Sequence, residues 1–149
     1  NELKTEVLLV SKYCLVLKQI LCVHKQLSVS KTLLFAYLLK NENNYYSALF
    51  NGNNSTDVVI KAISQISGNY TDYCKNIPYI IEAIHLLIQN GDILLNNSTL
   101  LCSEKNIGKE KYTNKFLQNA INESYNFSDR QFLKEVLSNE ELCFPQCVC

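Results

Sequence analysis

The chain has 149 residues with 14 basic and 14 acidic side chains, so it is neutral at pH 7 and long enough for one domain with a buried core. Its hydrophobic content of 47% excludes a disordered or fibrous protein. Proteins that bind nucleic acid through phosphates normally carry an excess of basic residues, so the charge balance argues against nucleic acid as the main partner. The four glycines lie between periodic segments and divide the chain into mostly helical elements.

Residues 2–24 are predicted to form one long helix with an almost continuous apolar surface. Leu8 and Leu15 add a second apolar face and leave only a narrow polar strip, so the helix needs partners on most sides. Two interpretations remain open: a central core helix, or an interface with another chain. Lys12 and Lys18 argue against a membrane span, and the segment has no signal-peptide cleavage pattern, so we expect a cytoplasmic protein with no membrane contact. The apolar seam is Leu3, Val7, Val10, Cys14, Leu17 and Leu21.

A second helix is predicted to begin after Ser28 or Ser30, either of which is a suitable N-cap, and to end near Lys40. The segment 41–54 is rich in asparagine and contains three aromatic residues, which favours an ordered surface excursion.

A third helix is predicted to begin at Ser55 or Thr56 and to end before Gly68. About nine residues, 68–76, then separate it from the next predicted helix, which is longer than the turn of a helix-turn-helix motif. The apolar residues of this third helix are Val58, Val59, Ala62, Ile63 and Ile66.

An amphipathic helix that leads into a β-hairpin is the most informative stretch of the chain. Pro78 suits the first turn of a helix, and Gly91 suits a left-handed C-cap. Residues 92–95 and 99–102 are two short apolar runs joined by residues 96–98, which tolerate a tight turn. This order of elements is typical of the second half of a winged-helix domain.

The predicted fold class is therefore mostly α with a small β-hairpin, as one domain over residues 1–149. A winged-helix-like part occupies about 28–103 and follows an extra N-terminal helix. A C-terminal helical extension occupies about 109–140 and contains a Ser128/Gln131 capping box. A cysteine-containing tail occupies 141–149.

Two sets of binding residues follow from these elements. If the apolar helices bind a protein partner, the interface candidates are Leu3, Val7, Val10, Leu17, Leu21, Phe116, Phe132 and Leu133. If the winged helix binds DNA directly, the contact candidates are Lys75, Tyr79, Gln89 and Asn90. Glu82 lies on the same polar side, and its negative charge would repel the DNA phosphates.

Catalytic and metal-binding patterns are weak in this sequence. His24 and His85 are not close to a nucleophile motif and are interpreted as hydrogen-bonded helix residues. Cysteines 14, 22, 74 and 102 lie in apolar patterns and are interpreted as buried small hydrophobes. The single cluster Cys143, Cys147 and Cys149 lacks a second ligand pair for zinc. We therefore expect a protein that is not an enzyme and that uses no metal, cofactor or small-molecule substrate.

Three segments together carry a family resemblance. They are the apolar N-terminal helix, the Ser-x-Ser-Lys-x-Leu-Leu helix that ends in Tyr37-Leu38-Leu39-Lys40, and the run from Pro78 to Ile84 that leads to Asn90-Gly91-Asp92-Ile93. This order resembles the middle component of bacterial three-component ABC-ATPase systems, some of which are Lamassu-type anti-phage defence systems. The resemblance implies a small adaptor that bridges a large SMC-like ATPase and an effector subunit, with at most indirect contact to DNA.

Two classes of function are compatible with these features, with a third in reserve. The adaptor hypothesis predicts partner-dependent solubility, and the alternative, a winged-helix transcriptional regulator, predicts a soluble homodimer whose DNA affinity falls steeply with salt. The reserve hypothesis is a secreted domain with disulfides, which a count of free thiols would test.

Overall fold

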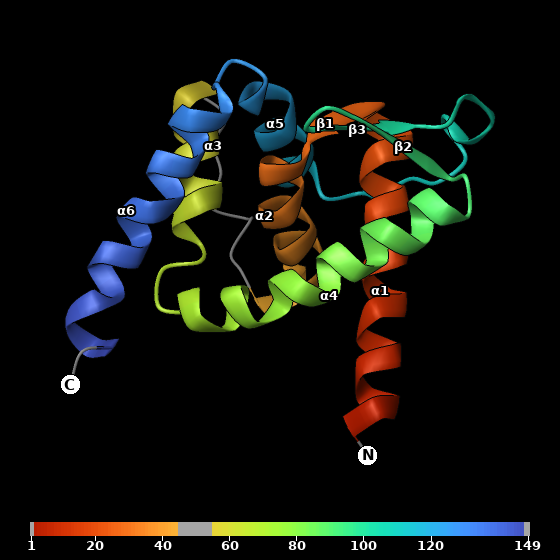
Figure 1. The fold of residues 1–149 in the computed structure, drawn as a ribbon. Coiled ribbons are helices and arrows are strands. Elements are labelled where there is room, and N and C mark those ends of the chain that lie inside the picture. Colours follow the sequence, from red (N-terminus) through yellow and green to blue (C-terminus); the bar gives the residue numbers. More distant parts are fainter. Residues whose placement is uncertain (1, 45–54, 148–149) are drawn as a thin grey trace.

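The computed structural model describes the backbone of residues 2–44 and 55–147, which form a mostly helical protein with a small three-stranded antiparallel sheet (Figure 1). The predicted fold class, mostly α with a small hairpin, is confirmed. The elements are α1 (Glu2–His24), β1 (Gln26–Ser28), α2 (Val29–Lys40), α3 (Ser55–Ser64), α4 (Tyr70–Gln89), β2 (Ile93–Asn96), β3 (Thr99–Cys102), α5 (Lys115–Ser124) and α6 (Asp129–Cys147), with short 3-10 turns η1 (Glu42–Asn44) and η3 (Glu104–Asn106).

Helix α2 is the centre of the fold. Residues 34–39 are all buried, so this helix contacts neighbours on every side along its second half. It packs against α1, α4, α5 and α6. The bounds predicted for this helix are confirmed, since it begins after Ser28 and ends at Lys40. Residues 45–54, which make up most of the predicted surface excursion, lie outside the described residues.

Helix α3 begins at Ser55, as predicted, and its predicted apolar set is buried at every position. Helices α5 and α6 cover the side of α2 and α3 away from α1 (Figure 1). Phe35 of α2 and Phe132 of α6 lie with ring centroids 5.7 Å apart in this part of the core. The capping box is also confirmed: the Ser128 amide donates to Gln131 Oε1 at 2.8 Å, and the Gln131 amide donates to Ser128 Oγ at 3.1 Å.

The predicted start of the fourth helix is wrong, because α4 begins at Tyr70 and Pro78 lies inside it. The first half of α4 is held by buried polar contacts: Tyr13 Oη donates to Asn76 Oδ1 at 2.7 Å, and Tyr37 Oη donates to Asp72 Oδ2 at 2.7 Å. Pro78 is exposed, and so is Cys74, the residue four positions earlier whose carbonyl the proline leaves without its usual helical donor. The connection from α3 to α4 is therefore only residues 65–69, not the nine residues expected.

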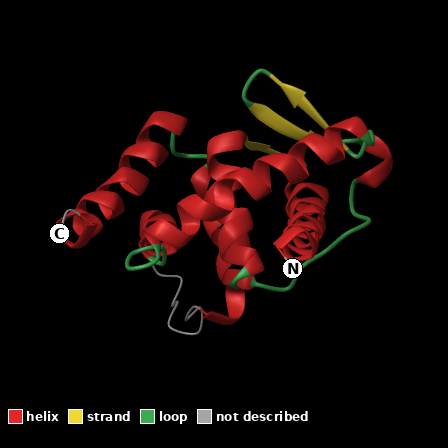
Figure 2. Ribbon diagram, turned by 60° about the horizontal axis from the view of Figure 1, so that its bottom comes forward, coloured by secondary structure: helices red, strands yellow, loops and turns green. Residues whose placement is uncertain are grey.

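The sheet has the strand order β1-β3-β2, and β1 is an element that the sequence pattern did not predict. Leu27 of β1 pairs with Leu100 of β3, which in turn pairs with Leu95 of β2. The chain leaves α1 through Lys25, which has a left-handed φ of 72° without being glycine. Gly91 has a φ of 80° and ends α4, as predicted. Figure 2 shows the hairpin of β2 and β3 at the edge of a helical body.

Helix α1 is the described helix that is long and apolar enough to cross a membrane by length and composition alone. Its second half is part of the protein core, where Tyr13, Leu17, Ile20 and Leu21 are fully buried. Of its apolar 18-residue stretch, 39% is buried inside the protein, and both core helices and N-terminal signal sequences reach this length and apolarity.

Candidate protein-binding surface

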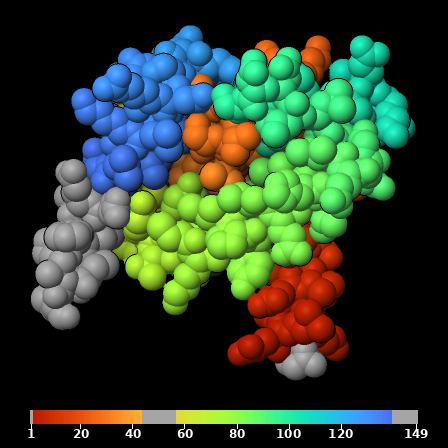
Figure 3. Space-filling view, viewed as in Figure 1, coloured from red at the N-terminus to blue at the C-terminus, as the bar shows by residue number. Residues whose placement is uncertain are grey.

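The first two turns of α1 project from the body of the protein. Residues 2–8 are all exposed, and they include Leu3, Val7 and Leu8, whose exposed fractions are 70%, 56% and 56%. In Figure 3 the N-terminal end of α1, in red, extends beyond α4. We call residues 2–8 the α1 arm. Three large apolar side chains exposed on one short segment are unusual for a surface that faces only water.

A groove lies where the α1 arm meets α4. It has a volume of about 180 Å³, and Leu86 contributes its apolar wall on the α4 side. Val10 is buried and forms the floor, whereas Glu6 and Glu82 are exposed. Apolar side chains with a few polar groups around them are typical of a surface that binds another molecule. The groove is lined by Leu3, Glu6, Val7, Val10, Ser11, Glu82 and Leu86.

A second hollow continues along the same seam between α1 and α4. It shares Leu86 with the first and has a volume of about 410 Å³. Lys18 and Asp92 line it, so both signs of charge are present at this end. The Asn90 amide donates to Asp92 at 2.9 Å, and this bond is the main cause of the lowered pKa of the Asp92 carboxyl. We refer to the two hollows together as the α1–α4 groove.

The predicted protein-interface residues separate into two groups in the structure. Leu3, Val7 and Leu133 are exposed. The other five are buried in this chain's own core: Val10 still lines the groove, whereas the remaining four present no exposed side chain to a partner. The exposed fractions of all five are 7% or less: Val10, Leu17, Leu21, Phe116 and Phe132.

The predicted DNA-contact residues do not gather into one patch. Lys75 and Gln89 are exposed on α4 but lie fourteen positions apart, roughly 21 Å along a helix axis. Tyr79 is partly buried against the core, and the Asn90 side-chain amide is already bonded to Asp92. Glu82, which was expected on the same polar side, is exposed between Lys75 and Gln89.

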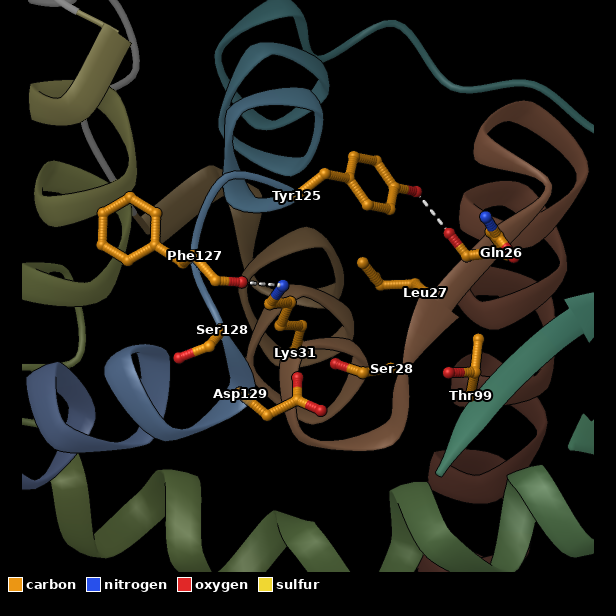
Figure 4. A pocket seen from close by; sticks show the side chains of 9 residues that line it. All are labelled: Gln26, Leu27, Ser28, Lys31, Thr99, Tyr125, Phe127, Ser128 and Asp129. Atoms are coloured by element: carbon orange, nitrogen blue, oxygen red, sulfur yellow. Dashed lines mark hydrogen bonds between the residues drawn. The ribbon is translucent and has the colours of Figure 1, made fainter. Parts of the chain in front are cut away.

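Figure 4 shows a third pocket, of about 290 Å³, which lies where the α5–α6 connection crosses the start of α2. Lys31 is only 6% exposed, and its Nζ donates to the Phe127 carbonyl at 2.6 Å. Ser30 Oγ donates to Asp129 Oδ1 at 3.3 Å, and Tyr125 donates to the Gln26 carbonyl. Burial lowers the pKa of Lys31, and Asp129 opposes this shift. These polar groups bond to one another, and their hydrogen bonds connect the α5–α6 segment to β1 and α2.

His24 is a structural residue at the end of α1. Its Nδ1 lies 3.2 Å from Asn122 Oδ1, and its Nε2 lies beside the Tyr112 hydroxyl. A neutral ring satisfies both contacts if Nδ1 donates to Asn122 and Nε2 accepts from Tyr112. Burial lowers the pKa of His24 below its usual 6.5, and the bond to Asn122 opposes this effect. The interpretation of His24 as a hydrogen-bonded helix residue is confirmed.

The lowered pKa of His24 predicts a loss of stability in mild acid. The unfolded chain takes up a proton at this residue more readily than the folded chain, so the free energy of unfolding falls as pH drops through about 6.5. Urea titrations at pH 7.5 and pH 5.5 measure this change. We expect His24→Gln to reduce the pH dependence, because the substituted side chain cannot take up a proton. A pH dependence in His24→Gln equal to that of the wild-type chain would contradict the assignment.

The cysteines outside the tail differ in accessibility. Cys22 and Cys102 are buried with their sulfur atoms 3.9 Å apart, and Cys14 is half-buried. Cys74 is exposed on α4, so its interpretation as a buried residue is wrong: it lies on the solvent side of a helix that begins earlier than predicted. The backbone of α6 runs to Cys147, while Cys149 lies outside the described residues.

Thiol alkylation should reflect these environments. Burial and the neighbouring Cys22 raise the pKa of Cys102 to about 11, so only about one Cys102 in a thousand is thiolate at pH 8. We expect iodoacetamide to label Cys74 much faster than Cys102, because Cys74 is exposed to the reagent whereas Cys102 is buried and its thiol rarely ionises. Peptide mapping by mass spectrometry gives the rate at each site. In guanidinium chloride the difference should disappear, and equal rates in the native protein would refute the described packing.

Within residues 2–43 and 57–139, whose side chains the structure describes, no group of three or more His, Cys, Asp or Glu side chains is arranged to hold a metal ion. Comparison of the chain with protein-family models, with curated proteins and with solved structures gave no match. The surface itself therefore has to carry any functional proposal.

Proposed function

We propose that this chain is a non-catalytic adaptor subunit of a cytoplasmic protein complex, and that it holds a partner protein at the α1 arm and the α1–α4 groove. The observation that carries this proposal is the exposure of Leu3, Val7 and Leu8 on a helix segment that projects from the body. These side chains belong to the first two turns of the 23-residue helix α1, and their exposed apolar surface is stabilised only when another molecule covers it.

The identity of the partners follows from the family resemblance of the sequence. Middle components of three-component ABC-ATPase systems imply two protein partners, a large SMC-like ATPase and an effector, in anti-phage defence. An adaptor between two partners needs two surfaces: Leu133 and Leu137 are exposed on α6, and α6 and α1 lie at opposite ends of the molecule in Figure 1. These two surfaces support a bridging role.

A DNA-binding regulator is the second candidate, and the arrangement of the sheet favours it. A strand between α1 and α2 and the strand order β1-β3-β2 are features of winged helices, while α3 is an additional helix between α2 and α4. The charges do not support it: Glu82 occupies the exposed face of α4, and Lys75 is far from Gln89. We therefore place this function second.

Affinity purification of the tagged chain from the organism that encodes it separates the two candidates. The adaptor proposal predicts recovery of a large ATPase in stoichiometric amount, measured by quantitative mass spectrometry. Recovery of the chain alone, as a soluble dimer whose DNA affinity falls steeply with salt, would overturn the adaptor proposal and support the regulator.

A further inference from the structure

The charges of the α1–α4 groove are one-sided at the end formed by the α1 arm. Four of the residues that line this end are apolar, two are glutamates and none is a cation. Glu6 comes from α1 and Glu82 from α4, so each wall of the groove contributes one exposed carboxylate. At the other end Lys18 and Asp92 compensate each other. The groove therefore favours a positively charged ligand at the end that contains Leu3 and Val7.

The spacing of the apolar residues fits a helix as the occupant. Leu3, Val7 and Val10 stand at positions i, i+4 and i+7 of α1, which cover roughly 10 Å along the helix axis. An amphipathic helix presents apolar side chains at the same spacing and can lay them into such a groove. Both walls are helices, so an extended segment would find no strand edge to pair with.

Resting on the proposed adaptor function, we infer that the α1–α4 groove binds an amphipathic helix of the partner whose apolar stripe is flanked by Lys or Arg. The apolar stripe covers Leu3, Val7 and Leu86, and the flanking cations lie beside Glu6 and Glu82. Complementary charge of this kind selects among helices of equal hydrophobicity, because a helix with acidic flanks is repelled at the same positions.

Two fluorescein-labelled model peptides test the inference on the full chain. Both are helical, have about 18 residues and carry a Leu stripe at i, i+3, i+4 and i+7 spacing; one is flanked by Lys and the other by Glu. Fluorescence anisotropy at low salt should show about tenfold tighter binding of the Lys peptide. Glu82→Lys, alone and with Glu6→Lys, should reduce and then reverse this preference. Glu135→Lys, the same charge change on α6 at a residue that lines neither hollow, should leave it unchanged.

Two other results of the peptide experiment would overturn the inference. Both can be told apart from a failure of the proposed adaptor function, which co-purification tests separately. Equal binding of both peptides, lost in Val7→Asp, would show an apolar docking site without charge selection. Binding of neither peptide would refute a helix-binding groove, and co-purification of the ATPase would still decide the function.

The same variants test two other candidates for what covers the α1 arm: a second copy of this chain and a membrane. Sedimentation that shows self-association, reversed by Leu137→Asp, would make α6 of a second copy the occupant, since Arg130 and Lys134 flank the Leu133 and Leu137 stripe. Co-sedimentation with vesicles of phosphatidylcholine and phosphatidylserine, lost in Val7→Asp, would assign the arm to a membrane. Either result would contradict the inference of a basic partner helix.

Discussion

Replacing Leu17 by alanine is expected to lower the free energy of unfolding by about 3 kcal/mol, within the range of roughly 2–5 kcal/mol measured for buried leucines. Leu17 is fully buried in the seam of α1, where the lost methyl groups leave a cavity among tightly packed neighbours. Urea unfolding followed by circular dichroism measures the change. An effect of this size would establish the second half of α1 as core.

Leu3→Ala is the matched control, because it makes the same change on the same helix. Leu3 is 70% exposed, so the expected change in the free energy of unfolding is less than about 0.5 kcal/mol. A similar loss in the free energy of unfolding at both positions would mean that the arm is packed in solution and that its apolar side chains are not accessible to a partner.

Replacing Val7 by aspartate is expected to weaken the complex with the partner by about a hundredfold or more, while the isolated chain keeps its fold. Val7 lines the groove and is 56% exposed in the isolated chain. Covering it with an apolar surface would desolvate the new carboxylate without a compensating bond, in a groove that already carries Glu6 and Glu82. Co-purification of the partner with the tagged variant, compared with the wild-type chain, measures the loss.

Leu137→Asp provides the matched control on the other side of the molecule. Leu137 is 49% exposed on α6, so it has an apolar exposure similar to that of Val7 but lies outside the α1–α4 groove. We expect this variant to retain the partner that binds the groove. Loss of the same partner from both variants would indicate a general effect of added charge or of solubility.

The helices could be predicted from the sequence because their apolar residues repeat at three-to-four-residue spacing. The predicted limits of α1, α2 and the start of α3 agree with the structure, and so do the hairpin and the Ser128 capping box. Strand β1 could not be predicted from the sequence, because it has only three residues and because the left-handed residue before it is Lys25 and not a glycine. The start of α4 escaped prediction because tertiary contacts to Asp72 and Asn76 stabilise helix on the N-terminal side of Pro78.

The binding surface could be predicted only in part. The periodicity of α1 shows that many of its faces are apolar, but it cannot show which turns have neighbours, and burial begins only at Val10. Glu6 and Glu82 are far apart in the chain and come together only because α1 packs across α4 (Figure 1). A pattern within one helix carries no information about such a pair.

Site-specific photo-crosslinking from position 7 tests the central claim most directly. A benzophenone amino acid in place of Val7, introduced in the organism that encodes the chain, reacts with whatever covers the α1 arm, and the same residue at position 137 reports on α6. The proposal predicts an adduct between position 7 and the partner recovered with the wild-type chain. A complex that persists without any adduct from position 7 would contradict the assignment of the α1 arm as the binding surface.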